Sequence, residues 1–194
     1  MASTDPVHVP RRRTLRFLQK TRIMITVLFL SDKSFSDNLY YTFLQSLNLF
    51  AIECTCHKKG CLIFYGWYKR KVKLPSKLLT LSIQRVRCRE CGRTHALIPS
   101  VLVPYSQITL KDQQDILILA ESGLPPAEVL ERNPRVDENN AKHIIRQYNK
   151  HWKERLLSIS LSVRDSLTIP CLSAFSRQFM QIHKTPNILF PTPT

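Results

Sequence analysis

The chain has 194 residues, of which 43% are hydrophobic; this is enough to bury a core and argues against a disordered protein. It carries 29 Lys and Arg against 14 Asp and Glu, a formal net charge of +15, which favours a polyanionic partner. No stretch of the sequence reaches the roughly 18 to 20 apolar residues of a membrane span, and no signal-peptide cleavage site follows its short apolar run. We therefore expect a cytoplasmic protein with no membrane partner, whose six cysteines are free thiols or metal ligands rather than disulfides.

The N-terminal part divides into a basic arm and a short folded segment. Residues 1–23 hold six cations and one acid without a periodic apolar pattern, which is typical of a disordered basic arm. The following segment, residues 24–52, begins with a methionine and a strand-like run, so an over-extended reading frame is an alternative interpretation of the arm. We expect a short helix over 37–46 after this strand, with Ser34 or Ser36 as its N-cap.

The strongest motif is the sequence Cys88-Arg-Glu-Cys91-Gly92. Two thiolates separated by two residues can bind one tetrahedral metal ion, and a glycine after the second lets the chain turn through positive φ. This pattern is typical of one knuckle of a zinc ribbon, whose other knuckle is expected roughly 15 to 30 residues away across a hairpin. The upstream candidates are three cysteines and a histidine: Cys54, Cys56, His57 and Cys61. We expect His95 to be a hydrogen-bonded structural histidine, with a role as a further ligand as the alternative.

A tetrahedral ion needs four ligands, so the choice among these residues stays open. Cys88 and Cys91 are expected to bind the metal in the downstream knuckle. Upstream, the wider loop between Cys56 and Cys61 favours these two, and Cys54 is a close alternative. Buried free cysteines are the competing interpretation, but five cysteines within 38 residues at knuckle spacing argue against it. Four thiolates leave no open position for water, so we expect a structural Zn²⁺.

The residues between the knuckles predict a β-hairpin. Residues 62–72 are rich in aromatic and branched side chains, and residues 79–84 alternate between apolar and polar side chains. Residues 74–78 supply the turn. The order of knuckle, strand, turn, strand and knuckle therefore predicts a zinc-ribbon domain over residues 53–104.

Most of the excess positive charge lies in this predicted ribbon. Residues 53–95 contain eleven Lys and Arg against two acids, a net charge of +9. Trp67 and Tyr68 stand beside cations, where they can stack on bases, although packing within the hairpin explains them equally well. The cations that we expect to contact nucleic acid here are Lys69, Arg70, Lys71, Arg85 and Arg87.

Residues 105–157 have the periodicity of helices. Thr109 suits an N-cap and Gly123 the position after a first helix, Pro126 can begin a short second helix, and Asp137 opens a longer third one. A short second helix and a basic third helix match the outline of a helix-turn-helix. We expect the third helix to place Asn139, Asn140 and Arg146 near base edges, and Lys142, Lys150 and Lys153 near phosphates. A plain solvated helix face is the alternative.

The segments 84–97 and 66–70 resemble a bacterial family of uncharacterised proteins. The zinc ribbon of that family is similar to the N-terminal module of insertion-sequence transposases. The resemblance covers roughly residues 24–157 and implies a zinc ribbon followed by a helix-turn-helix, which transposases use to recognise the ends of the element. The first knuckle departs from the family pattern, because Thr55 and His57 stand where Cys-x-x-Cys-Gly is more usual.

Together these observations predict an α+β protein, with a small zinc-ribbon β-hairpin domain followed by a helical, helix-turn-helix-like domain. We expect it to bind duplex DNA without being an enzyme. Transposase catalysis needs spaced carboxylates on a fold of more than about 100 residues, whereas 37 residues follow Leu157 and Asp165 is their single acid. The tail, residues 158–194, has no predicted role. The alternative functions are a zinc-ribbon protein–protein interaction module and a small metal-dependent hydrolase, which would need an open coordination position.

Overall fold

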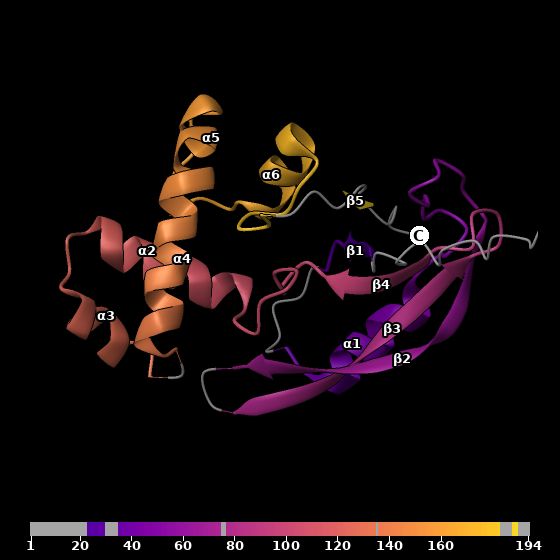
Figure 1. Cartoon of the computed structure of the whole chain (residues 1–194), viewed down its shortest axis with the longest axis horizontal. Helices are drawn as coiled ribbons and strands as arrows, with labels where there is room; N and C mark the ends of the chain where they lie inside the picture. Colours follow the sequence, from indigo (N-terminus) through magenta and orange to yellow (C-terminus); the bar gives the residue numbers. More distant parts are fainter. Residues whose placement is uncertain (1–22, 30–34, 75–76, 135, 183–187, 190–194) are drawn as a thin grey trace, which may run out of the picture.

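The computed structural model describes residues 23–29, 35–74, 77–134, 136–182 and 188–189. The predicted arm over residues 1–23 lies outside these described residues except for Ile23, which is the first residue of β1 rather than part of an arm. The fold is α+β, as predicted, with the sheet and the helical part side by side (Figure 1). In chain order the elements are β1 (Ile23–Val27), α1 (Asp37–Ser46), β2 (Leu62–Lys73), β3 (Leu78–Cys88), β4 (Thr94–Pro99), α2 (Leu110–Glu121), α3 (Pro126–Glu131), α4 (Glu138–His151), α5 (Lys153–Ser158), α6 (Thr168–Phe175) and β5 (Ile188–Leu189). No helix in the described part of the chain is long and apolar enough to cross a membrane.

One sheet joins the predicted ribbon to the segment that precedes it. Within the described residues it has five strands in the order β2-β3-β4-β1-β5. β2 and β3 form the antiparallel hairpin expected between the knuckles, and β4 extends it. β1 then pairs in parallel with β4, from Ile23 opposite His95 to Val27 opposite Pro99. The prediction of residues 24–52 as a segment separate from the ribbon is therefore wrong for β1, because a pairing between strands so distant in sequence leaves no local pattern.

Helix α1 forms hydrogen bonds with β3 next to the residues of β3 that pair with β4. Its N-cap is Ser36, whose Oγ accepts a hydrogen bond from the Leu39 N–H at 3.2 Å. Tyr40 is buried and its hydroxyl donates to the carbonyl oxygen of Leu97 at 2.9 Å. The same hydroxyl accepts the backbone N–H of Gln84 at 3.1 Å. Burial raises the pKa of Tyr40, so its hydroxyl remains a donor at neutral pH.

Replacing Tyr40 with Phe is expected to lower the free energy of unfolding by about 1 to 3 kcal/mol, because it leaves two buried backbone groups without a partner. Chemical denaturation monitored by circular dichroism measures this loss. Tyr41, the exposed neighbour in the same helix, provides the matched control, and Tyr41→Phe should change stability by less than about 0.5 kcal/mol. Equal stability of the two variants would contradict the role assigned to the Tyr40 hydroxyl.

The helical part has a core of its own, which runs from Val103 to Met180. The predicted helix starts are confirmed: Thr109 caps α2 by accepting the Asp112 N–H, and Asp137 caps α4. Trp152, at the junction of α4 and α5, is fully buried in this core. The predicted third helix is thus two helices in the structure, because α4 ends at His151 and α5 begins at Lys153.

Two contacts connect the helical part to the half of β2 that lies next to the turn of the hairpin. Arg70, in β2, donates from Nη2 to the carbonyl oxygens of Val103, at 2.6 Å, and Ser106. Burial lowers the pKa of this guanidinium. Lys73 pairs with Asp137, the N-cap residue of α4, with 3.3 Å between Nζ and Oδ2. The cations of the hairpin and those of α4 therefore belong to elements that touch.

Candidate metal centre and basic surfaces

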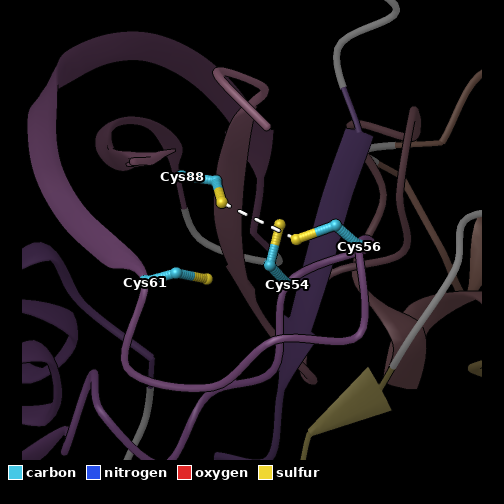
Figure 2. A group of neighbouring side chains, drawn as sticks. All are labelled: Cys54, Cys56, Cys61 and Cys88. Carbon is cyan, nitrogen blue, oxygen red and sulfur yellow. Dashed lines mark hydrogen bonds between the residues drawn. The ribbon is translucent and has the colours of Figure 1, made fainter. Parts of the chain in front are cut away.

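Four cysteine thiols converge at one end of the sheet (Figure 2). The Sγ atoms of Cys54, Cys56, Cys61 and Cys88 all lie within 4.8 Å of one another. The hairpin brings the two knuckles together, since β2 and β3 pair Leu62 with Cys88. The Sγ atoms of Cys56 and Cys88 are 3.8 Å apart. Tetrahedral coordination with metal–sulfur bonds of about 2.3 Å places the sulfur atoms about 3.8 Å apart, so the spacing of Cys56 and Cys88 suits two ligands of one metal ion.

Backbone hydrogen bonds shape the loops that carry these thiols. The N–H of Cys54 donates to the carbonyl oxygen of Lys58 at 2.9 Å, which folds the upstream loop back on itself. The N–H of Arg89 donates to the carbonyl oxygen of Cys61 at 2.8 Å and joins the two knuckles. Gly92 has φ +68°, as the knuckle motif predicted.

The fifth predicted thiol, that of Cys91, lies at the margin of the group. Its Sγ is 3.6 Å from the Sγ of Cys54, and its side chain is exposed. The four-thiol group contains all three upstream cysteines, whereas the spacing favoured Cys91 over Cys54. The structure therefore gathers five thiols, one more than a tetrahedral ion takes.

The protonation states of the thiols differ within the centre. Burial raises the pKa of Cys54 and of Cys61. Burial also acts to raise the pKa of Cys88, but the N–H of Cys91 and the neighbouring thiols outweigh it and lower that pKa. Cys88 thus carries the thiolate most readily, and a bound metal ion would displace the protons of the other ligands.

The two histidines near the cysteines occupy different environments. His57 is exposed and its Nδ1 lies 3.1 Å from the Oε1 of Glu53. His95, on β4, is only 1% exposed, and its Nε2 lies 3.3 Å from the Sγ of Cys54. Burial lowers the pKa of His95, so the ring is neutral at pH 7. This contact is compatible both with the expected hydrogen-bonded structural histidine and with the alternative, a further ligand.

The cations expected to contact nucleic acid on the hairpin fall into two groups. Arg70 differs from the others because backbone carbonyls of the helical part occupy its guanidinium. The others have no carboxylate partner among the described residues: Lys69, Lys71 and Arg87, which are exposed, and Arg85, which is half-buried.

The cations expected on the third helix all lie on exposed positions. Lys142, Arg146 and Lys150 are exposed on α4, where Lys142 pairs with Glu138 at 2.6 Å, and Lys153 is exposed at the start of α5. Lys142, Arg146 and Lys150 line an open hollow of about 600 Å³. Ile145 and Asn149 also line it, and neither was predicted as a binding residue. Helical spacing could have predicted both residues, because positions three apart lie on the same face of a helix. Ile145 lies three residues after Lys142, and Asn149 three residues after Arg146.

The two asparagines at the start of α4 have different surroundings. Asn139 is exposed. Asn140 is half-buried, and its side-chain amide donates to the carboxylate of Asp137. Asn139 is therefore the freer of the two to contact another molecule.

No curated protein and no solved structure matches this chain. One family model matches residues 54–126, a segment that begins at the first clustered cysteine and ends at the first residue of α3. That model is described as a domain of unknown function (DUF6431), so this segment is similar to an uncharacterised domain family.

Proposed function

We propose that the chain is a zinc-dependent protein that binds duplex DNA and has no catalytic activity of its own. The observation that carries the proposal is the set of cations without carboxylate partners on the hairpin, together with the exposed basic face of α4. An ion pair between Lys73 and Asp137 connects the turn end of the hairpin to the N-terminus of α4. Such paired basic surfaces suit the regularly spaced phosphates of a duplex.

Zinc is the metal that this proposal assigns to the cysteine cluster. Soft thiolate donors in a tetrahedral set select zinc or an iron–sulfur cluster rather than magnesium or calcium. The four thiols come from the upstream loop and from the ends of β2 and β3, so a bound ion would tie these segments together. A site filled by four thiolates stabilises the fold and leaves no position for a catalytic water, which disfavours the hydrolase alternative.

Helix α4 is the element that we assign to the major groove. It follows the short α3 and packs against α2, as the last helix of a helix-turn-helix does. Arg146 and Asn149 are of the residue types that read guanine and adenine edges, and Lys142 and Lys150 flank them as phosphate ligands. This arrangement supports a relationship to the DNA-recognition modules of transposases, or a regulatory role on DNA.

A protein–protein interaction module is the second candidate. Exposed aromatic side chains near the upstream loop favour it: Phe50 is 74% exposed and packs beside Gly60, and Phe64 is 55% exposed. In that case the positive charge would serve solubility alone. The two candidates differ in what they predict for DNA.

A titration of labelled duplex DNA with the zinc-loaded chain at several salt concentrations tests the proposal. We expect the logarithm of the association constant to fall linearly with the logarithm of the salt concentration, with a slope of about −0.9 for each phosphate contacted. Undetectable binding at about 50 mM salt would contradict DNA binding and favour the interaction module.

A further inference from the structure

The long hairpin contains an irregularity at Tyr65. β2 and β3 pair in register on both sides of it, but the pairing steps directly from Phe64 opposite Val86 to Gly66 opposite Arg85. Tyr65 therefore has no partner on β3 and forms a β-bulge. Gly66 follows it with φ +137°, a conformation that other residues rarely adopt. Bulges of this kind redirect a side chain, and here the redirected side chain is an aromatic ring that is 50% exposed.

The redirected ring lies over two arginines. Arg85 and Arg87 are two residues apart on β3 and so lie on the same face of the sheet. Their guanidinium carbons are 5.4 and 5.6 Å from the centre of the Tyr65 ring. Neither arginine forms an ion pair with a carboxylate in the part of the chain that the structure describes. We call these three residues, Tyr65, Arg85 and Arg87, the bulge platform.

A small cavity adjoins the bulge platform on the side of β4. It has a volume of about 80 Å³ and is lined by Arg85, Tyr68 and Thr94, with Met24, His95 and Ala96. This is about the volume of two or three water molecules in the liquid. The cavity is therefore too small for a planar base, and among its lining residues Arg85 is the cation.

We propose that the bulge platform binds an unpaired nucleotide of single-stranded DNA. The ring of Tyr65 stacks on the base, and Arg85 and Arg87 hold the adjoining phosphate. The faces of single-stranded bases are accessible, so an aromatic ring can stack on them. In a duplex the neighbouring base pairs cover the faces of each base. The inference rests on the proposed DNA binding and extends it, since α4 and the exposed lysines of the hairpin, Lys69 and Lys71, would contact paired DNA and the bulge platform an unpaired end or gap.

The test uses the zinc-loaded full chain and three labelled probes: an oligothymidine single strand, a blunt duplex, and the same duplex with a single-stranded overhang. Tyr65→Ala is expected to weaken binding of the single strand and of the overhang by about tenfold, and to change blunt-duplex affinity by less than about twofold. Tyr65→Phe keeps the ring and should retain the wild-type affinity. Trp67→Ala is the matched control. Trp67 is a similarly exposed aromatic of β2, but its ring contacts Tyr41, which favours the packing interpretation of this residue over base stacking.

The outcomes separate this inference from the proposed function. Blunt-duplex binding by the wild type, with single-strand binding that Tyr65→Ala leaves unchanged or that Trp67→Ala weakens equally, would overturn the bulge platform and leave the proposed function standing. Selective loss of single-strand binding in Tyr65→Ala, with no blunt-duplex binding by the wild type, would support the bulge platform and overturn the duplex proposal. Absence of binding to all three probes would overturn both.

Discussion

Replacing Cys88 with Ser is expected to abolish stoichiometric zinc binding and to unfold the sheet around the cysteine cluster. The apparent free energy of binding at a structural zinc site is on the order of 10 kcal/mol, comparable with the whole stability of a small domain. Cys88 is buried at the end of β3 and belongs to the group of four mutually close thiols. Metal analysis of the purified variant and its thermal unfolding curve measure the two effects.

Cys171→Ser is the matched control for this experiment. Cys171 is also buried, but it lies in α6 within the core of the helical part. Its replacement should leave the zinc content at one ion per chain. Full zinc content in Cys88→Ser would refute the metal centre as described.

The same measurement on the other cysteines identifies the ligands. From the four-thiol group we expect zinc to be lost in Cys54→Ser and retained in Cys91→Ser. The opposite result would establish the knuckle arrangement that the spacing favoured, with Cys91 as a ligand and Cys54 beside the site.

Reversing two charges on α4 is expected to weaken duplex binding on the order of 100-fold, because a base contact and a phosphate contact are both replaced by repulsion. The variant is Arg146→Glu with Lys150→Glu, and both residues are exposed, so thermal unfolding should not change. Fluorescence anisotropy with a blunt duplex measures the affinity.

The control for charge alone is on another helix. Lys111→Glu changes an exposed cation of α2 that already pairs with Asp115, and it should reduce affinity by less than about threefold. If Lys111→Glu weakens binding as much as the α4 variant, the attraction is non-specific and α4 is not the reading element.

The elements that the sequence predicted well are those with local signals. The hairpin follows from alternating side chains, and the starts of α2 and α4 follow from the capping residues Thr109 and Asp137. The pairing of β1 with β4 depends on contacts between residues about 70 positions apart, from Ile23 with His95 to Val27 with Pro99. Such contacts form from burial in three dimensions, and no motif in either strand records them.

In the candidate site, too, local spacing was predictive, whereas contacts between residues distant in sequence were not. Cysteine spacing predicted that the knuckles meet, but it did not show that Cys54 joins the mutual group while Cys91 lies at its margin. The role of Arg70 was hidden as well, because the carbonyls that it binds belong to a loop more than 30 residues away. The sequence pattern around a basic residue in a strand is the same whether its side chain faces solvent or another part of the fold.

The central claim is that the metal-loaded chain binds duplex DNA through its basic surfaces. The most direct test is the salt titration with a blunt duplex, run on the zinc-loaded chain and on the same chain after removal of the metal. We expect a steep salt dependence for the loaded chain, and an affinity at least about tenfold lower after the metal is removed, because the hairpin no longer holds its cations in place. No binding by the loaded chain, or equal affinity with and without the metal, would contradict it.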